Sequence, residues 1–307
     1  MGVASVAEGL AVQPEEIGLG IVTSSKRAAK ELLTMLGKPR PKSYEEQIYA
    51  SLIRRGDVCF DVGANNGDVA LMLARLAGYS GTVIAFEPVW PMYAQMCRHL
   101  QRDIHLKAPI IPLPIGLADS DKDATIQVPN GNFGFGSMSS ANEWKGALAS
   151  TMADAKLASY QVRLQSVDSF LAASSLPEPV FMKIDVEGAE LFVLRGANDM
   201  FARGARPLML IEIFAPWERA FGYRPWEPLF WLLERGYRLL FACPNGLVEH
   251  TPTEANPFPP EYEAGYNVVA FVPEIHSERI ESLNNMRAGA GGKLLAMDPS
   301  SGPNRAL

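Results

Sequence analysis

From residue 57 onward, short apolar runs alternate with amphipathic helical patterns, and this alternation constrains the fold more than any other feature of the chain. Apolar runs at 58–62 and 82–87 are each followed by a turn and then by helical spacing, at 68–78 and from Pro88 onward. Strands that alternate with helices form a mostly parallel sheet with helices on both of its faces. The alternation therefore predicts an α/β fold.

The second half of the chain continues this pattern and changes it at the end. The last two apolar runs are joined by a short connection that contains Asn245, Gly246 and several prolines. A short connection without a helix fits an antiparallel pair, because a parallel crossover needs a dozen or more residues. The predicted later elements are strands at 110–118, 180–186, 207–214, 237–243 and 266–272, and helices at 187–204 and 226–236.

The flanks of this pattern define the predicted domain organisation. A chain of 307 residues allows one large domain or two small ones, and the strand–helix count favours a single α/β domain at 43–275. This domain begins with a helix at 43–55. We expect an N-terminal extension at 1–42 that is partly helical, at 25–37, and a disordered tail at 276–307 that is rich in Gly, Pro and Ser.

Residues 119–166 interrupt the alternation. They contain two strand-like runs, at 124–128 and 160–166, which flank the Gly- and Ser-rich loop 130–140. We expect an insertion that lies over one end of the sheet. Its loop is predicted to be either a lid over an acceptor site or a flexible hairpin, with Phe133, Phe135 and Ser139 as its notable side chains.

The composition argues against several classes of function. The net charge of −6 and the pI of about 5.4 are unlike those of broad nucleic-acid binders, which need a basic surface. The three cysteines form no CxxC pair, and the four histidines lack the spacing of a zinc site. No apolar stretch reaches the ~20 residues that span a bilayer, and the first ten residues contain no Lys or Arg. We therefore expect a cytoplasmic protein with no nucleic-acid or membrane partner.

Acidic residues stand at the carboxyl ends of the first two predicted strands, where an open parallel sheet binds its ligands. Asp61 precedes a turn with Gly63 and Gly67, and Glu87 ends the second strand. The turn lacks the Gly-Lys-Ser/Thr of a P-loop, and Asn65 stands where the dinucleotide motif G-x-G-x-x-G requires glycine. A carboxylate at Glu87 can accept hydrogen bonds from both ribose hydroxyls, and Asp61 can pair with an ammonium group. These features favour a nucleoside cofactor with an amino-acid moiety, such as S-adenosylmethionine.

Several motifs taken together resemble one family. They are FDVGANNG at 60–67, AFEP at 85–88, IGLADSD at 115–121, KIDVEGAELFVLRGA at 183–197, LIEIF at 210–214 and NVVAFV at 267–272. Over about residues 45–275 the chain resembles a class I S-adenosylmethionine-dependent methyltransferase of the FkbM type. The resemblance implies a Rossmann-like, seven-stranded, mostly parallel sheet with an antiparallel last strand. It also implies methyl transfer to a hydroxyl group of a sugar, a polyketide or another small metabolite.

The resemblance maps a cofactor site onto this sequence. The first motif would border the methionine part of S-adenosylmethionine, Glu87 would hold the ribose, and the turn at 117–119 would lie beside the adenine. Asp119 is either an acceptor for the adenine amine or an ordinary turn residue. The predicted cofactor-binding residues are Asp61, Gly63, Ala64, Asn65, Gly67, Glu87, Pro88, Leu117, Ala118 and Asp119.

Three acids that follow the fourth and fifth strands are the candidate catalytic residues. Methyl transfer needs an aligned acceptor, exclusion of water and a group that takes the proton, and we expect Asp185, Glu187 or Glu212 to be that group. Structural alternatives exist, because Glu187 can complement a helix dipole and Lys183 can pair with a neighbouring acid. A divalent metal held by these carboxylates is a rival role that we do not favour, so no metal ligand is predicted.

Aromatic residues after the fifth strand have two interpretations. They wall an acceptor pocket or stack on a sugar face, or they pack in the core; the residues are Trp217, Phe221, Tyr223 and Trp226. Trp90 and Trp231 lie in helical patterns and are expected in the core.

Two further functions compete with methyl transfer to a small hydroxylated acceptor. The first is an NAD-dependent oxidoreductase on a similar sheet, against which Asn65 argues. The second is a non-catalytic nucleoside-binding protein that keeps the fold, against which the acids at 61, 87 and 185 argue. The sequence does not indicate an oligomeric state.

Overall fold

The computed structural model describes residues 44–103, 107–129, 156–214, 219–260, 262 and 266–286 of the chain. The chain divides into two units, Met1–Lys42 and Ser43–Leu307, and all the described residues belong to the second. The predicted helix at 25–37, the loop 130–140 and Trp217 lie outside the described residues.

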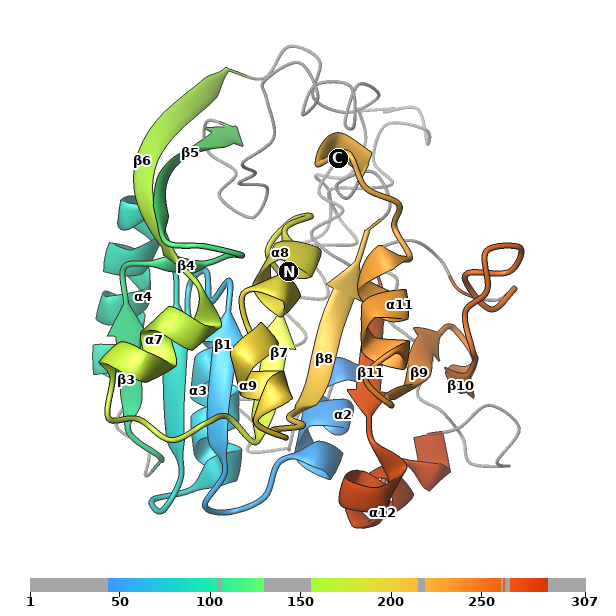
Figure 1. Ribbon diagram of the computed structural model, residues 1–307. Coiled ribbons are helices and arrows are strands. Elements are labelled where there is room, and N and C mark those ends of the chain that lie inside the picture. Colours follow the sequence, from blue (N-terminus) through green and yellow to red (C-terminus); the bar gives the residue numbers. More distant parts are fainter. Residues whose placement is uncertain are drawn as a thin grey trace, which may run out of the picture. The chain divides into compact units, whose positions relative to one another are not determined.

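The centre of the second unit is an eight-stranded sheet with the order β10-β9-β11-β8-β7-β1-β2-β3 (Figure 1). Neighbours from β8 to β3 pair in parallel, whereas β11 is antiparallel to both β8 and β9. The strands are β1 (Val58–Val62), β2 (Thr82–Phe86), β3 (Ile110–Leu113), β7 (Phe181–Ile184), β8 (Leu208–Ile213), β9 (Arg238–Cys243), β10 (Gly246–Glu249) and β11 (Tyr266–Phe271). The seven predicted strands and the reversed last strand are confirmed.

The eighth strand, β10, comes from the connection between the last two predicted strands. β10 forms an antiparallel hairpin with β9, in which Gly246 pairs with Cys243. Gly246 has a φ of 126°, in the region that favours glycine, and this allows the tight turn after Asn245. The polar turn residues therefore add an edge strand to the sheet.

The predicted third strand at 110–118 is divided between two sheets. β3 contains the first half of this predicted strand and forms an edge of the large sheet. Pro112 has no backbone N–H, and it is tolerated here because no further strand on the open side needs a hydrogen-bond donor. The second half becomes β4 (Gly116–Leu117), which pairs with β6 (Leu157–Gln165), and β6 pairs antiparallel with β5 (Lys122–Pro129). Figure 1 shows β5 and β6 extending past the carboxyl end of the large sheet, as expected for the insertion.

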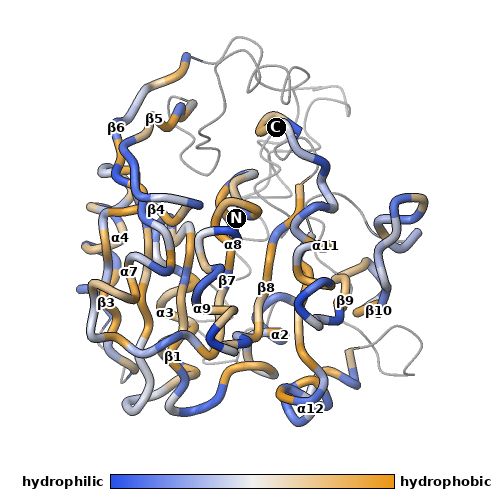
Figure 2. The backbone as a smooth tube through the Cα atoms, in the orientation of Figure 1, coloured by the Kyte–Doolittle hydropathy of each residue, from blue (hydrophilic) through white to orange (hydrophobic). Residues whose placement is uncertain are grey.

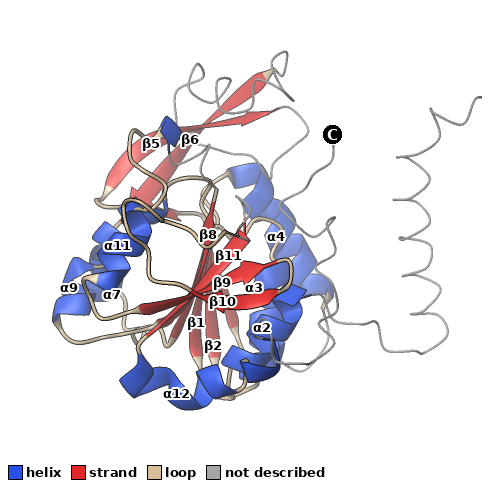
Figure 3. Ribbon diagram, turned by 90° about the vertical axis from the view of Figure 1, so that its right-hand side faces the viewer, coloured by secondary structure: helices blue, strands red, loops and turns tan. Residues whose placement is uncertain are grey.

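Helices cover both faces of the large sheet, as the alternation predicts (Figure 3). One apolar cluster packs α7 (Val167–Ala173), α8 (Glu190–Arg195), α9 (Asn198–Ala202) and α11 (Glu227–Leu233) on one face. A second cluster packs α2 (Tyr44–Leu52), α3 (Asp68–Ala77), α4 (Trp90–Arg102) and α12 (Pro273–Glu281) on the other. Figure 2 shows the hydrophobic residues concentrated along strands such as β8, between these layers. This burial is the main stabilising contribution of the unit.

The predicted helix at 187–204 is two helices, α8 and α9, which meet at Gly196. A Cβ atom on Gly196 would lie 1.9 Å from the carbonyl oxygen of Ala118, so only glycine fits at this position. Asp168 of α7 then accepts hydrogen bonds from the backbone N–H groups of Asp199 and Met200, at 2.8 Å each, and caps the second helix. The helix is therefore broken by a close backbone approach that composition alone does not reveal.

Two other expectations change. Trp90 is 64% exposed at the start of α4, so it is not a core residue, whereas Trp231 is buried as expected. Part of the predicted tail at 276–307 is folded, because α12 (Pro273–Glu281) and a 3₁₀ turn (Asn284–Met286) pack Ile280 and Met286 into the second apolar cluster. Residues 287–307 lie outside the described part of the chain.

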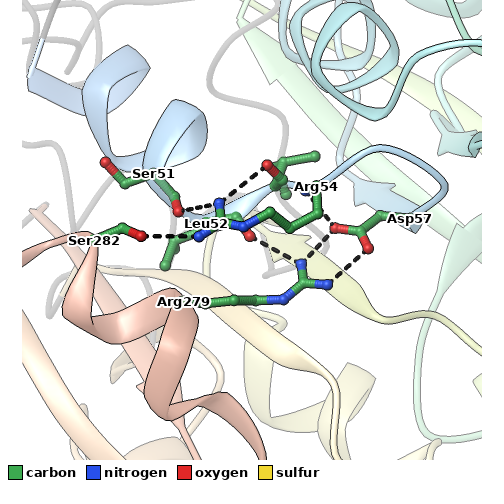
Figure 4. A network of polar contacts seen from close by, with 7 residues as sticks. Ser51, Leu52, Arg54, Asp57, Arg279 and Ser282 are labelled. Atoms are coloured by element: carbon green, nitrogen blue, oxygen red, sulfur yellow. Dashed lines mark hydrogen bonds and ion pairs between the residues drawn. The ribbon is translucent and has the colours of Figure 1, made fainter.

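A network of polar contacts ties α12 to the segment before β1 (Figure 4). Asp57 is buried and accepts hydrogen bonds from the guanidinium of Arg279 and from the backbone N–H of Arg54. Arg54 in turn donates to Ser282, and Arg279 donates to the carbonyl oxygen of Leu52. Both oxygens of Asp57 are therefore paired.

No helix in the described part of the chain is long and apolar enough to cross a membrane. The cysteines Cys59, Cys97 and Cys243 are all free.

Candidate active site

The turn after β1 is fixed to the end of β2 by backbone hydrogen bonds. The N–H groups of Gly63 and Ala64 both donate to the carbonyl oxygen of Phe86, at 3.1 and 2.9 Å. Asn65 has a φ of 49°, in the left-handed region that Asn tolerates better than most residues, and its N–H donates to Glu87 Oε2 at 2.9 Å. The first two strands thus bring the predicted cofactor residues Gly63, Ala64, Asn65 and Glu87 together.

Gly63 and Gly67 are required by packing within this turn. Both have a positive φ, 83° and 86°. A Cβ atom on Gly63 would lie 1.9 Å from the carbonyl oxygen of Asp185, and one on Gly67 would lie 2.9 Å from Met96 of α4. Gly63 therefore lets the end of β1 approach the end of β7, which places the predicted cofactor turn against the predicted catalytic acid.

Glu87 is buried, and its carboxylate accepts hydrogen bonds from backbone N–H groups of two segments, the turn after β1 and the residues after β2. Its Oε1 accepts a hydrogen bond from the N–H of Val89 at 2.9 Å, in addition to the bond from Asn65 to Oε2. Burial raises the pKa of Glu87 to about 7, although these two N–H donors lower it. Each carboxylate oxygen has two lone pairs, so the bonds to the backbone orient Glu87 and leave acceptor capacity for a ligand.

The carboxylate of Asp61, unlike that of Glu87, accepts no hydrogen bond of ordinary geometry from a described backbone N–H group. Its side chain is fully buried, and no hydrogen bond from a described residue reaches either carboxylate oxygen within ordinary geometry. Burial raises the pKa of Asp61 to about 6, while Lys183 and the backbone N–H of Ala70 lower it. Burying an unpaired carboxylate is costly, so this residue is a candidate for pairing with a cationic group of a ligand.

The buried Lys183 forms a charged group with the partly buried Asp185 and Glu212 at the ends of β7 and β8. The Lys183 ammonium lies 2.7 Å from Asp185 Oδ2, and Lys183 pairs in register with Asp61 across β1 and β7. Burial opposes ionisation of Asp185, but Lys183 and a hydrogen bond with Glu212 outweigh it and lower its pKa. Burial and the charge of Asp185 raise the pKa of Glu212 well above its usual value. The two shifts run in opposite directions, so Asp185 is the more acidic member of the pair and Glu212 the member that holds a proton more readily.

Glu187 lies in a strained turn directly after this group. Glu187 and Gly188 have φ values of 53° and 97°. Glu190 Oε1 accepts hydrogen bonds from the N–H groups of Val186 and Gly188, at 3.0 and 3.3 Å, and the Tyr223 hydroxyl donates to the carbonyl oxygen of Gly188 at 2.5 Å. Because a left-handed non-glycine residue persists only where its surroundings hold it, Glu190 and Tyr223 fix the backbone of Glu187. Glu190 was not among the predicted site residues, although it lies within the motif EGAE.

Aromatic residues gather beside this turn. The Phe192 ring contacts Phe221 and Tyr223, at centroid distances of 5.7 and 5.9 Å, and the Lys122 ammonium lies 6.0 Å from the Phe192 centroid. Phe221 and Tyr223 are only partly buried. Two of the aromatics predicted to wall an acceptor pocket thus lie close to Glu187, whereas Trp226 packs at the start of α11 under Arg224.

The predicted adenine-side residues are divided by their exposure. Leu117 and Ala118 are buried in the apolar clusters, so their side chains pack in the interior of the protein. Asp119 is exposed, and the Lys122 ammonium lies 2.7 Å from its Oδ1. Partial burial opposes ionisation of Asp119, but Lys122 and Ser120 lower its pKa. Pro88 lies against Gly116, where an added Cβ would be 3.3 Å from Pro88 Cγ.

Residues 61–239 match the model of the methyltransferase FkbM domain. The chain belongs to this family. Residues 61–239 therefore form a methyltransferase FkbM domain, which contains all the predicted cofactor-binding and catalytic residues. The family is one of S-adenosylmethionine-dependent methyltransferases, and this favours methyl transfer over the NAD-dependent alternative.

A curated relative and several solved structures resemble this FkbM-domain chain. The hexuronic acid methyltransferase AglP of Haloferax volcanii is 28% identical over 159 residues, which are 52% of this chain and 56% of the relative. The chain thus spans little more than half the length of that relative. The methyltransferase FkbM of Methylobacillus flagellatus KT has a TM-score of 0.35 at 14% identity, over 74% of this chain and 50% of that one. The O-methyltransferase TM0748 of Thermotoga maritima has a TM-score of 0.36 at 12% identity, over 78% and 69% of the two chains.

No group of three or more His, Cys, Asp or Glu side chains among the described residues is arranged to hold a metal ion. Asp185 is instead engaged by the Lys183 ammonium.

Proposed function

We propose that this protein is an S-adenosylmethionine-dependent O-methyltransferase that acts on a hydroxyl group of a small acceptor, with a sugar as the favoured class. The observation that carries the proposal is the buried, unpartnered carboxylate of Asp61 beside the Lys183–Asp185–Glu212 group. Asp61 suits the ammonium of the cofactor, and Asp185 suits the proton of the acceptor. Residues 43–286 would then be one catalytic domain, preceded by an extension at 1–42.

The cofactor-binding roles follow from the geometry of the strand ends. Asp61 would pair with the ammonium of the methionine moiety, because it offers two acceptor oxygens without a donor of the described chain. Glu87 would accept hydrogen bonds from the ribose hydroxyls, in an orientation fixed by Asn65 and Val89. Gly63, Ala64, Asn65 and Gly67 would border the methionine part, and Pro88, Leu117, Ala118 and Asp119 would lie on the adenine side.

When bound, S-adenosylmethionine supplies a methyl group that is already activated on a sulfonium. The protein must therefore align an acceptor oxygen, exclude water and take a proton. Lys183 keeps Asp185 ionised, so that Asp185 can accept the proton of the acceptor hydroxyl as its oxygen bonds to the methyl group. Glu212 holds a proton more readily than Asp185, and its hydrogen bond with Asp185 would hold that carboxylate in place. Glu187 stands in a rigid turn that would orient the acceptor.

The aromatic residues beside Glu187 support a sugar as the acceptor. Phe221 and Tyr223 are partly buried, and apolar faces of pyranose rings stack on such side chains. The curated relative from Haloferax volcanii bears the name of a hexuronic acid methyltransferase, which is consistent with this class. We place no metal in the reaction, and saturating EDTA is expected to leave turnover unchanged.

The test combines binding and turnover. Calorimetry should show that the wild type binds S-adenosylmethionine, and labelled cofactor should transfer its methyl group to a member of a panel of neutral sugars and uronic acids. Asp185→Asn should lower kcat by at least about a hundredfold with cofactor binding retained, because the proton acceptor is lost. Asp123→Asn, on the exposed hairpin, is the matched control. Absence of cofactor binding by the wild type would reject the proposal, and binding without transfer to any acceptor would favour the non-catalytic alternative.

A further inference from the structure

The first helix of the described chain, α2, carries an acid into the charged group at the strand ends. Tyr49 is fully buried, and its ring packs edge-on against Phe181 at the start of β7, with centroids 6.0 Å apart. The Tyr49 hydroxyl donates a hydrogen bond to Glu45 Oε1 at 2.9 Å. Glu45 also interacts electrostatically with Lys183 and Asp185. No residue of α2 was among the predicted site residues.

Glu45 increases an imbalance of charge in this group. It adds a fourth carboxyl group to those of Asp61, Asp185 and Glu212, whereas Lys183 is the one cation among the described residues that interact with Glu45. Burial raises the pKa of Glu45, while Lys183 and the hydrogen bond from Tyr49 lower it. The group therefore has more acids than its own lysine can neutralise, and a cationic ligand would relieve the imbalance.

We propose that Glu45 is a specificity-determining residue that favours the positively charged sulfonium cofactor over its neutral thioether product. This inference rests on the proposed function, in which Asp61 pairs with the ammonium of the cofactor and Asp185 takes the proton of the acceptor. Phe181 and Lys183 are two residues apart on β7 and so share one face of the sheet. Tyr49 packs on Phe181, and Glu45 lies one helical turn before Tyr49 on α2, so Glu45 lies on the side of the sheet that bears Lys183 and affects the charged group there.

The physical basis is that the two ligands differ by a single charge. S-adenosylmethionine and S-adenosylhomocysteine share the adenosine, the ammonium and the carboxylate, and only the first bears a positive charge on sulfur. A carboxylate near that sulfur, in a partly buried site, attracts the positive charge of the sulfonium and has no such attraction to the neutral thioether. Glu45 would thus lower the affinity for the product relative to the cofactor once the methyl group has been transferred, which assists release.

The experiment measures both dissociation constants by calorimetry at about pH 8, because burial raises the pKa of Glu45 and a higher pH favours its ionised form. Glu45→Gln keeps an oxygen that can accept the Tyr49 hydrogen bond but removes the charge. We expect the preference for S-adenosylmethionine over S-adenosylhomocysteine to fall by about five- to tenfold relative to the wild type. Glu46→Gln, the same substitution on the next residue of α2, is the matched control and should leave the preference within about twofold.

Two further variants separate charge from structure. Glu45→Asp retains the charge and should keep most of the preference, even if its shorter side chain loses the bond to Tyr49. Tyr49→Phe removes that hydroxyl without changing any charge, and should reduce the preference less than Glu45→Gln does. Thermal unfolding of each variant confirms that a folded protein is compared.

The possible results are distinct. A fall in the preference in Glu45→Gln, with recovery in Glu45→Asp, supports the proposal. Equal weakening of both ligands in Glu45→Gln, or no change in either, overturns it and gives Glu45 a structural role only, while the proposed function stands. A wild type that binds neither ligand overturns the proposed function and this inference together.

Discussion

Two buried aspartates at the two ends of the same strand differ in every aspect of their surroundings. Asp57, just before β1, has both oxygens paired with Arg279, and the backbone N–H of Arg54 also donates to it. Asp61, within β1, has no hydrogen bond of ordinary geometry from a described residue to either oxygen, although the charge of Lys183 and the N–H of Ala70 favour its ionised form. Asp57 therefore stabilises the fold, whereas Asp61 destabilises it and is retained, in our interpretation, for a ligand.

The difference depends on which groups replace the hydration of each carboxylate when folding buries it. A buried carboxylate costs several kcal/mol unless charges and donors replace its hydration. Asp57 finds these in a bidentate guanidinium, and the network also joins α12 to the rest of the unit (Figure 4). Asp61 shares the nearby Lys183 with Asp185, which alone makes the direct ion pair. Sites of ligand binding are expected where such compensation is incomplete.

Breaking the Asp57 network should give the largest loss of stability. Asp57→Ala leaves the partly buried guanidinium of Arg279 without its carboxylate, and we expect the free energy of unfolding to fall by about 3–5 kcal/mol. Urea denaturation measures this change. The double variant Asp57→Ala/Arg279→Met should recover part of the loss, because the unpaired charge is then absent. A loss below about 1 kcal/mol in the single variant would show that the network contributes little.

Asp61→Asn should have the opposite effect on stability. Its folded-state pKa of about 6 exceeds the usual value of 3.8, so the folded wild type holds this proton more tightly than the unfolded chain does. The wild type therefore loses stability from this group as pH rises from about 4 to about 6. We expect Asp61→Asn to be about 2–3 kcal/mol more stable than the wild type above pH ~6, and equally stable below pH ~4.

Calorimetry completes the test of Asp61. The same Asp61→Asn variant should bind S-adenosylmethionine at least about tenfold more weakly, because the ammonium loses its ionised partner. Other acids that titrate in this pH range, such as Glu87, affect the stability of both proteins alike, so their contributions cancel in the stability difference between Asp61→Asn and the wild type. Lower stability of Asp61→Asn at every pH, or unchanged affinity, would contradict the contrast with Asp57.

The fold could be predicted from sequence to the extent that local patterns carry it. The strands, the helical layers and the reversed last strand follow from apolar runs, helical spacing and a short final connection. The division at Gly196 could not be predicted, because it depends on the Ala118 carbonyl oxygen, which arrives from a distant part of the chain. The exposure of Trp90 is likewise a matter of tertiary packing.

The prediction of the site from sequence is limited in the same way, because tertiary contacts determine it. Sequence placed acids at the ends of strands, but their contacts depend on which strands are neighbours. β7 lies next to β1, and only this order brings Lys183 level with Asp61 and the Asp185 carbonyl oxygen against Gly63. Glu45 comes from a helix whose packing has no sequence signal beyond its amphipathic pattern. The residue types could be predicted, therefore, but the charge balance of the group could not.

The hydrogen bonding of Glu190 is intermediate between that of Asp57, whose two oxygens are both paired, and that of Asp61. One of its oxygens accepts two backbone N–H groups, and the other has no partner among the described residues. Glu190→Gln keeps an acceptor for the turn, whereas Glu190→Ala removes it. We expect Glu190→Ala to lower kcat by about tenfold with the affinity for the cofactor unchanged, because the turn that holds Glu187 relaxes. Glu190→Gln should retain most of the activity; equal losses in both variants would argue against a positioning role.

Asp119 should show the smallest effect, because it resembles neither buried aspartate. Its side chain is 35% exposed and already pairs with Lys122 at 2.7 Å, so its charge is compensated by a neighbour and by water. We expect Asp119→Asn to change stability by less than about 1 kcal/mol and to weaken cofactor binding by less than about threefold. A neutral amide can still accept a hydrogen bond from the adenine amine through its oxygen. Loss of affinity as large as that in Asp61→Asn, measured by the same calorimetry, would place Asp119 in direct contact with the cofactor and show that exposed, paired acids can matter as much as buried, unpaired ones.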